Sequence, residues 1–334
     1  MERRKKIVSA LVILLAIAAA VAIGVLAQRR SADYEAESYN GIAMGTIVSM
    51  KLYDETAPAL SKQVMAQIDA LEQTISWRVE SSPVAALNRS GACSNETVSS
   101  VVAQCAPISD AANGAFDLTI GKVSELWDFG GEKQGVPEPD ALRDALRSVD
   151  YKALTADGAS VTAKSGQHLD LGAVGKGLAC DRIRALLSLT DIKGAVVSVG
   201  GSILCFGSRN KAGEPWRVAI RHPRREDALL GTIRLKEGFV STSGDYEKFF
   251  EQDGKRYFHI LDARTGYPAR TELCSVTVVC DNGLLSDALS TACFLLGREE
   301  SEPLLERYNA SAVFMTKEGE ISTFGNVDFT ANES

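Results

Sequence analysis

The sequence predicts an α+β fold of mixed, largely antiparallel sheets with packed helices, preceded by one N-terminal transmembrane helix. Three observations support this prediction. The chain has 334 residues, of which 45% are apolar and 24% charged, which is typical of a globular protein with a sizeable core. Residues 57–76 carry apolar side chains at helical spacing, whereas short alternating segments dominate from residue 195 onward. A stretch of 21 residues without charge, 7–27, comes before both.

The apolar stretch 7–27 has the length that a helix needs to cross about 30 Å of hydrocarbon. Four basic residues precede it and only Arg29 and Arg30 follow closely, so the charge bias predicts a cytoplasmic N-terminus and a body outside the cytoplasm. The stretch is longer than the core of a signal peptide, about 7–15 residues, which favours an uncleaved anchor. Cleavage near the alanines of AIAAAVA is the alternative. We expect residues 1–30 to form this anchor or signal segment.

The body that follows is acidic. Without residues 1–30 the chain has 30 basic and 42 acidic residues, a net charge of −12, whereas the whole chain has −7. Nonspecific binding to nucleic acid or to an anionic lipid surface needs a positive field. The charge therefore argues against nucleic acid as a partner.

The seven cysteines show neither a C-x-x-C pair nor zinc-ligand spacing, which argues against a metal cluster or a thioredoxin-type centre. Cys274 and Cys280 lie six residues apart in a predicted strand, about 20 Å if extended, too far for a disulfide. A disulfide between Cys93 and Cys105 stays open, and the odd total leaves at least one thiol free.

The predicted elements follow in chain order. Residues 31–40 read as a polar stalk, 45–53 as a strand, and 57–76 as a helix that Thr56 caps. Further helices are predicted at 97–113, 137–149, 175–189 and 284–297, with an irregular turn at 114–121. Strands are predicted at 195–201, 202–207, 216–222, 231–243, 256–263, 273–280, 311–316 and 320–325. No internal repeat divides the chain, so we expect one unit, 41–327, and a polar tail, 328–334.

A glycine-rich segment, LDLGAVGKGLACDRI, leads into the helix predicted at 175–189. Gly172, Gly175 and Gly177 surround Lys176, so backbone amides, a helix N-terminus and a point charge could approach a phosphate together. The segment lacks the spacing of a Walker A loop. An ordinary glycine-rich turn into a helix is the alternative, and a bulge or tight hairpin is the alternative for the pair Gly200 and Gly201.

A second polar segment spans residues 240–268 and contains His259, one of three histidines in the chain. The segment reads as a strand, a hairpin and a second strand that holds His259. An imidazole there could take a proton from a hydroxyl nucleophile near neutral pH, while Lys248 or Arg256 held a phosphate. A structural or surface histidine is the alternative.

The helix predicted at 284–297 places Asp287 and Thr291 at i and i+4, so a carboxylate and a hydroxyl share one face. Both are hard oxygen donors of the kind that Mg²⁺ takes beside substrate phosphates and water. The alternative is an acid that interacts with the helix dipole and a threonine that fills space.

Eight segments, taken in order, resemble the ApbE family, the FAD:protein FMN transferases, over almost all of 41–325. They are MGTIVSM, ISWRVESSPVAALN, GAFDLTIG, LDLGAVGKG, VVSVGG, STSGDYEKFF, HILDARTGYP and SDALSTACFLLG. The resemblance implies an α+β body related to the T-fold. It implies that FAD is bound as substrate with Mg²⁺ and that FMN is transferred to a Thr or Ser hydroxyl of a flavoprotein with an FMN-binding domain, with release of AMP. It also implies a bacterial cell membrane as the location.

The resemblance also implies roles for individual residues. His259 matches the catalytic histidine. The Mg²⁺ ligands would be Asp287, Thr291 and the main-chain carbonyl of Ala173. The residues that contact FAD would be Met44, Trp77, Ala115, Phe116, Asp117, Asp170, Lys176, Gly201, Ser243 and Lys248.

Two other functions stay open from the sequence. With water as the nucleophile, the same site would hydrolyse FAD to FMN and AMP. A non-catalytic protein of the cell envelope that stores flavin is the second alternative, although storage does not require His259, Asp287 and Thr291 together.

Overall fold

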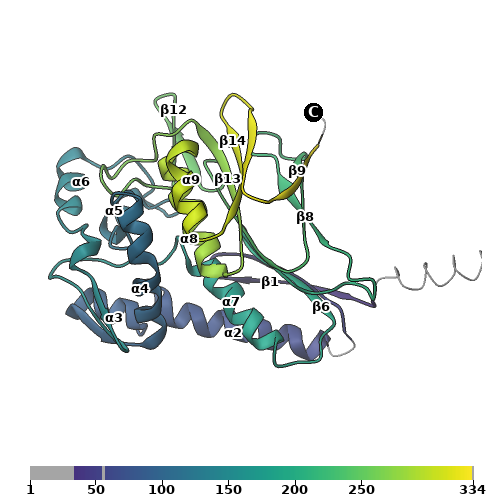
Figure 1. The fold of residues 1–334 in the computed structure, drawn as a ribbon. Coiled ribbons are helices and arrows are strands. Elements are labelled where there is room, and N and C mark those ends of the chain that lie inside the picture. The colour runs from purple at the N-terminus through teal and green to yellow at the C-terminus, as the bar shows by residue number, and fades with distance from the viewer. Residues whose placement is uncertain (1–33, 55–56, 333–334) are drawn as a thin grey trace, which may run out of the picture.

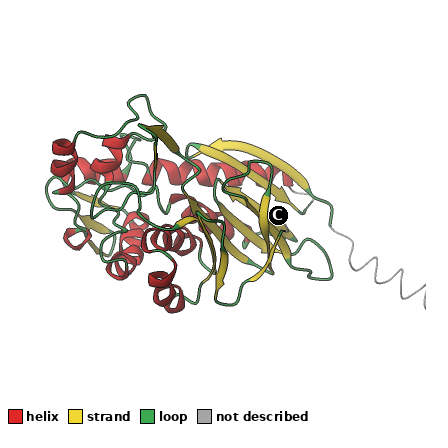
Figure 2. Cartoon of the chain, turned by 90° about the horizontal axis from the view of Figure 1, so that it is seen from above, coloured by secondary structure: helices red, strands yellow, loops and turns green. Residues whose placement is uncertain are grey.

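The computed structural model describes residues 34–54 and 57–332 and has the predicted α+β architecture. In the described residues an eight-stranded antiparallel sheet has the order β1-β2-β6-β7-β10-β13-β14-β15. Its strands are β1 (Glu37–Ala43), β2 (Thr46–Leu52), β6 (Gly194–Val199), β7 (Ser202–Gly207), β10 (Gly238–Gly244), β13 (Leu273–Cys280), β14 (Ser311–Thr316) and β15 (Ile321–Phe324). The strands gather toward one end of the molecule and the short helices toward the other (Figures 1 and 2).

The described helices are α2 (Ala57–Ile75), α3 (Pro83–Ser90), α4 (Glu96–Ala111), α5 (Gly121–Trp127), α6 (Pro139–Leu146), α7 (Gly175–Leu187), α8 (Gly283–Leu296) and α9 (Arg298–Arg307), with a 3₁₀ turn at Tyr151–Ala153. Of these, α2, α7, α8 and α9 pack against the large sheet, whose alternate strand residues point toward them. In contrast, α5 and α6 belong to a separate core cluster. In β10, Phe239 belongs to the large core that includes residues of α7 and α8, whereas the next residue, Val240, belongs to the core on the opposite face.

A three-stranded sheet covers part of that opposite face. It has the order β16-β9-β8 and consists of β8 (Trp216–Arg221), β9 (Leu229–Leu235) and β16 (Asp328–Ala331). Its apolar side chains pack against those of the large sheet, as Val218 and Ile233 do in one core cluster with Val240. Two smaller sheets complete the fold, β3-β5-β4 (Ala92–Ser94, Ser160–Thr162, Thr155–Asp157) and β11-β12 (Phe249–Gln252, Lys255–Phe258).

Both predicted boundaries of the body are wrong. Residues 37–40 of the predicted stalk belong to β1, because they pair with β2 residue by residue from Glu37 to Ala43. Residues 328–331 of the predicted tail form β16, which pairs with β9. The folded unit therefore extends beyond 41–327 at both ends.

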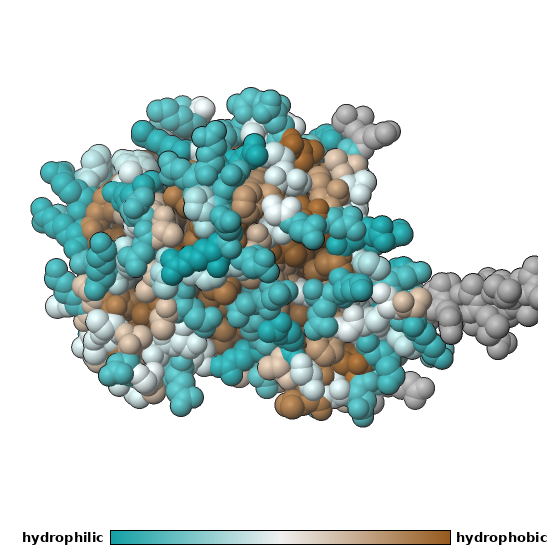
Figure 3. All heavy atoms as spheres, viewed as in Figure 1, coloured by the Kyte–Doolittle hydropathy of each residue, from teal (hydrophilic) through white to brown (hydrophobic). Residues whose placement is uncertain are grey.

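The predicted membrane anchor, 7–27, lies outside the described residues, as does Thr56. Within the described ranges, no helix is both long and apolar enough to cross a bilayer. All seven cysteines lie in these ranges and are free thiols, so the structure does not contain the Cys93–Cys105 disulfide. On the face drawn in Figure 3, hydrophilic side chains cover most of the surface.

Candidate active site

A buried ion pair joins the first turn of α7 to α8. The ammonium of Lys176 lies 3.8 Å from Oδ2 of Asp287, and the backbone N–H of Gly177 donates to the same oxygen at 2.9 Å. Asp287 is only 2% exposed, so both partners compensate a charge that would otherwise be costly to bury. The Asp287 carboxylate raises the pKa of Lys176, while burial of the ammonium opposes this effect. Lys176 therefore stays cationic at neutral pH.

Glycines allow α7 and α8 to approach so closely. A Cβ atom on Gly177 would lie 2.1 Å from the carbonyl oxygen of Gly283, and one on Gly283 would lie 2.3 Å from the carbonyl oxygen of Gly177. The carboxylate of Asp181 in α7 accepts from the N–H groups of Gly283 and Leu284, at 2.8 and 2.7 Å, and so caps the N-terminus of α8. These contacts fix Asp287 against Lys176.

The three predicted Mg²⁺ ligands fit a magnesium ion by their chemistry. Ala173 precedes Val174, the N-cap residue of α7, so the hydrogen bonds of the helix do not use its carbonyl oxygen, and no described residue donates to that oxygen. The Thr291 hydroxyl lies 3.2 Å from that of Ser243. One carboxylate, one hydroxyl and one carbonyl are a hard oxygen set that leaves room for substrate phosphates and water. The described chain contains no cluster of three or more His, Cys, Asp or Glu that could hold a metal alone.

The β6–β7 turn reaches the same ion pair. Gly200 has a φ of +56°, and a Cβ atom there would lie 3.2 Å from Cδ of Lys176. A Cβ atom on Gly201 would lie 3.1 Å from Oε1 of Glu247. Two glycines therefore let the backbone of this turn approach Lys176 and Glu247 closely.

Glu247 is a charged group of this site that the sequence analysis missed. Loss of water around its carboxylate raises its pKa, and the neighbouring Lys176 ammonium opposes this effect. The only signal in the sequence is its place in the polar segment 240–268, which already contained Lys248 and His259.

His259 lies just beyond β12, not inside a strand as predicted. The strand ends at Phe258, and the His259 N–H donates to the carbonyl oxygen of Lys248 at 3.0 Å. Its Nδ1 atom is buried without a hydrogen-bond partner. Desolvation and the positive charges of Lys176 and Lys248 lower the pKa of His259 to about 3. The imidazole is therefore neutral at physiological pH and has a free nitrogen, as a proton acceptor needs.

The turn Ala115–Asp117 is tied to the loop that follows His259, since the Ala263 N–H donates to the Ala115 carbonyl oxygen at 3.0 Å. The side chains of Ala115, Phe116 and Asp117 are buried. The Asp117 carboxylate accepts from the N–H and hydroxyl of Thr119 and from the N–H of Tyr151. Burial raises the pKa of Asp117 and these hydrogen bonds lower it. The Asp117 side chain thus braces the turn, and only backbone atoms of 115–117 remain to contact a ligand.

Met44 and Asp170 support the loops beside α7. The Met44 N–H donates to the Glu72 carboxylate at 2.9 Å, and a Cβ atom on Gly175 would lie 3.0 Å from the Met44 side chain. The Asp170 carboxylate accepts from the N–H of Gly172 at 2.9 Å and so shapes the glycine-rich loop.

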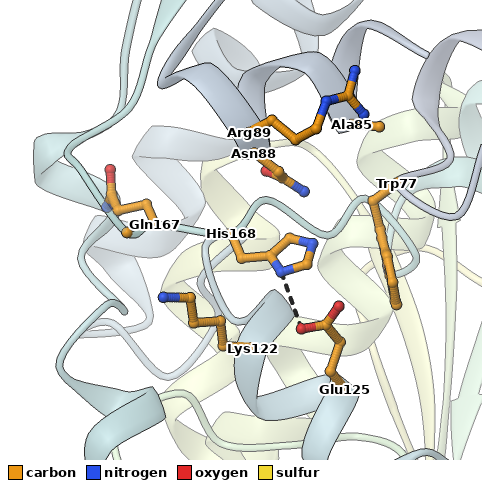
Figure 4. A pocket seen from close by; sticks show the side chains of 9 residues that line it. Trp77, Ala85, Asn88, Arg89, Lys122, Glu125, Gln167 and His168 are labelled. Carbon is orange, nitrogen blue, oxygen red and sulfur yellow. Dashed lines mark ion pairs between the residues drawn. The ribbon is translucent and has the colours of Figure 1, made fainter. Parts of the chain in front are cut away.

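Trp77 lines a pocket of about 350 Å³ that lies between α3, α5 and the loop before α7. Its ring packs edge to face with that of His168, whose Nδ1 lies 3.3 Å from the Glu125 carboxylate (Figure 4). The Arg78 guanidinium lies 4.1 Å from the centre of the indole ring, and Nε1 of Trp77 is buried without a partner. Trp77 is the only residue of the predicted site that lines this pocket. The sequence analysis missed the other lining residues because they are dispersed over 85–168.

Comparisons with known proteins identify relatives of this chain. A FAD:protein FMN transferase of Treponema pallidum is 33% identical over 293 residues, 80% of each chain, and one of Klebsiella pneumoniae is 33% identical over 86% of this chain and 92% of its own. The crystal structure of the ApbE protein of Thermotoga maritima matches with a TM-score of 0.78 and 31% identity over 86% of this chain and 96% of that one. Flavinyl transferase ApbE of Pseudomonas stutzeri, in its apo form, matches with a TM-score of 0.76 and 29% identity over 91% and 96%. The sequence model of the ApbE family matches residues 44–315, and the chain belongs to this family.

Proposed function

We propose that this chain is an FAD:protein FMN transferase, which moves the FMN half of FAD onto a Thr or Ser hydroxyl of a target flavoprotein and releases AMP. In this reaction the hydroxyl oxygen forms a bond to the FMN phosphorus and the bond to the bridging oxygen of the diphosphate breaks. The hydroxyl proton goes to the enzyme, and AMP takes the bridging oxygen. The names of the relatives support the reaction.

One structural observation carries the proposal, namely that the Lys176 ammonium lies 3.8 Å from the Asp287 carboxylate. Its positive charge also acts on His259, whose pKa is lowered by desolvation and then by Lys176 and Lys248. The proposed base and a proposed cation ligand thus share one ammonium as a common electrostatic partner. A hydroxyl is too weak an acid to ionise unaided, so the free nitrogen of neutral His259 is the group that takes its proton.

Lys176 and Lys248 make the basicity of His259 depend on whether substrate is bound. Lys176 and Lys248 lower the pKa of His259 in the free protein. A diphosphate bound between them would bring negative charge that offsets theirs, so the pKa of the imidazole would rise and its basicity would increase as FAD binds. The base would thus strengthen when there is substrate to attack.

Asp287, Thr291 and the Ala173 carbonyl would hold Mg²⁺, which when bound would neutralise charge on the diphosphate. Lys176 would add a fixed positive charge on the same group. Trp77 offers an aromatic face for the flavin or the adenine.

The acceptor would be a flavoprotein with an FMN-binding domain on the outer side of a bacterial cell membrane. This proposal rests on the apolar stretch 7–27 and the charges that flank it. The net charge of −12 on the body disfavours nucleic acid as a partner.

The test is an acceptor-labelling assay. The full-length chain is incubated with FAD, Mg²⁺ and a candidate FMN-binding domain, and intact-mass spectrometry of the acceptor is used to look for the addition of one FMN. The acceptor with its target hydroxyl residue changed to Ala is the control. An added FMN mass that the control lacks supports the proposal. Free FMN and AMP with an unlabelled acceptor would identify a hydrolase, and unchanged FAD would indicate a flavin-binding protein.

A further inference from the structure

Three hydroxyl groups form a chain of hydrogen bonds between α8 and β10. The Thr291 hydroxyl lies 3.2 Å from that of Ser243, which lies 2.8 Å from that of Ser290. The Ser290 hydroxyl in turn donates to the backbone carbonyl of Asp287 at 2.9 Å. Ser290 is fully buried and Ser243 is 8% exposed, so these two hydroxyls are shielded from bulk water, whereas Thr291 is partly exposed.

The Asp287 carbonyl, at which this series of hydrogen bonds ends, determines which hydroxyl donates in each of the bonds. A backbone carbonyl can only accept, so the single proton of Ser290 is used there. Ser290 must then accept from Ser243, and Ser243 must accept from Thr291. This direction makes all three hydrogen bonds, whereas the reverse direction leaves out the bond from Ser290 to the carbonyl. Burial favours the direction that satisfies more groups.

The direction of the chain matters at Thr291, whose hydroxyl can either donate a proton or offer lone pairs. When its proton points to Ser243, its lone pairs remain for another partner. This orientation favours a cation, because it leaves both lone pairs of the hydroxyl free and keeps its proton, which would repel the metal, on the side of Ser243. In the reverse direction Ser243 would donate to Thr291, so that one lone pair would be used and the threonine proton would not be held away from the metal.

We infer that Ser290 is a positioning residue for the cation site, which acts through Ser243 to hold the Thr291 proton away from the metal. The inference rests on the proposed function in one respect, the assignment of Thr291 as a metal ligand. Ser290 itself is hydrogen-bonded to Ser243 and to the Asp287 carbonyl and would act only through them.

The same helix contains a matched control one turn earlier. Ser286 is also fully buried, donates to an i−3 carbonyl, that of Gly283, at 3.1 Å, and pairs with a β10 serine, Ser241, at 2.6 Å. The Ser241 hydroxyl then donates to Ser202 at 3.1 Å and so leads to β7 and not to a predicted ligand. Ser286→Ala and Ser290→Ala therefore remove equivalent bonds, but only the second touches the chain that ends at Thr291.

The experiment measures Mn²⁺ binding to the full-length chain with FAD present, by electron paramagnetic resonance of the free ion. We expect Ser290→Ala to weaken Mn²⁺ binding by about 10-fold, the lower end of the effect of residues that orient metal ligands. Ser286→Ala should leave Mn²⁺ binding unchanged. Thermal unfolding of both variants verifies that they fold and compares the stability that each has lost.

A double-mutant cycle separates positioning from a general effect on structure. In a Thr291→Val background there is no threonine proton to orient, so Ser290→Ala should weaken Mn²⁺ binding no further. An equal loss in both backgrounds, an equal loss from Ser286→Ala, or wild-type binding by Ser290→Ala would each overturn the inference. If the wild-type chain bound no Mn²⁺, the inference would fail together with the metal site. If the variants changed Mn²⁺ binding as expected but the enzyme labelled no acceptor, only the proposed transferase activity would be contradicted.

Discussion

Desolvation and the ammonium groups of Lys176 and Lys248 lower the pKa of His259, so that the imidazole is neutral, and its Nδ1 atom has no hydrogen-bond partner. If this nitrogen takes the acceptor proton, His259→Ala should keep FAD binding and slow FMN transfer by about 10²–10⁴-fold. FAD binding is measured by flavin fluorescence and transfer by the mass of the acceptor. His222→Ala is the control, since His222 lies in the β8–β9 connection and its Nδ1 accepts from the N–H of Arg224. Full activity of His259→Ala would remove this imidazole from the mechanism.

The same pKa shift makes stability depend on pH. The pKa of His259 is about 3 in the folded chain and near 6.5 when unfolded, so between these values the unfolded state binds a proton that the folded state does not. His259 should therefore reduce stability as the pH falls from about 6.5 toward 3. In urea denaturation at pH 7 and pH 4.5, the stability of His259→Ala should decline less steeply than that of the wild type, by up to about 1.4 kcal/mol per pH unit. Parallel declines would contradict the shift.

Asp287 carries the only carboxylate among the three predicted cation ligands. Asp287→Asn keeps the shape of the side chain and removes its charge, so the Mg²⁺ concentration for half-maximal transfer should rise at least about 10-fold. The control is Asp110→Asn, whose carboxylate lies at the surface and accepts from the Tyr151 hydroxyl at 2.8 Å. An unchanged Mg²⁺ titration for Asp287→Asn would exclude this carboxylate as a ligand.

At the scale of elements, the close approach of α7 and α8 is what joins Asp287, a proposed cation ligand, to Lys176. Ala in place of Gly normally stabilises the interior of a helix by about 1 kcal/mol. Gly177→Ala should do the opposite, because its Cβ atom would lie 2.1 Å from the Gly283 carbonyl oxygen and 2.7 Å from Cβ of Asp287. We expect a loss of about 1–3 kcal/mol in chemical denaturation, as for other overpacked cores.

Gly135→Ala is the control for this prediction. The nearest atom to its added Cβ would be 3.9 Å away, so the change in stability should stay within about 0.5 kcal/mol. If Gly177→Ala were as stable as the wild type, the two helices would have to be free to move apart. The contact would then not fix the geometry of the site.

The sequence predicted the elements whose periodicity is strong, such as α2, α7 and α8, to within a few residues. It did not predict β1, because the segment 37–43 is polar on its exposed face and offers little apolar alternation. It predicted one strand over 256–263, whereas β12 ends at Phe258, although the His259 N–H still donates to the Lys248 carbonyl oxygen in register with the β11–β12 pairs. It also missed α3, although Ser82 and Pro83 form an ordinary helix start.

Candidate site residues that the structure brings together were predictable where a motif carries them, as for Lys176 and Asp287. What stayed hidden depends on contacts across the sheet and between helices. The Asp117 carboxylate accepts from the N–H of Tyr151, which is 34 residues away in the sequence. The Gly177 N–H donates to the Asp287 carboxylate, which is 110 residues away. Spacing in the sequence cannot reveal such partners, because the fold alone brings them together.

At the scale of the whole molecule, the site lies where the helical layer meets the large sheet. Lys176 and Asp287 come from α7 and α8, Ser243 from β10, and His259 from the segment after β12 (Figure 1). These parts are far apart in the chain and are held by one continuous core that joins the sheet to the helices. On the side of the sheet, the residues that would contact a bridging ligand are therefore held in fixed positions by this core.

The short segment between the apolar stretch and the described body limits how far the body could lie from a membrane. The described body begins at Tyr34, whose N–H donates to the Arg209 carbonyl oxygen at 2.7 Å, seven residues after the apolar stretch ends at Ala27. Seven residues span at most about 25 Å, so a membrane anchor at 7–27 would hold Tyr34 within that distance of the lipid. The net charge of −12 on the body would disfavour contact with anionic headgroups.

Cell fractionation tests this arrangement. The full-length chain should stay in the membrane fraction after washing with high salt and with alkaline carbonate, since apolar insertion depends little on ionic strength. A chain without residues 1–30 should be recovered in the soluble fraction and should label a soluble acceptor domain as fast as the full chain does. Salt-sensitive release of the full chain would indicate that charge and not insertion holds it. Membrane retention of the truncated chain would show that the body itself binds lipid, against its negative charge.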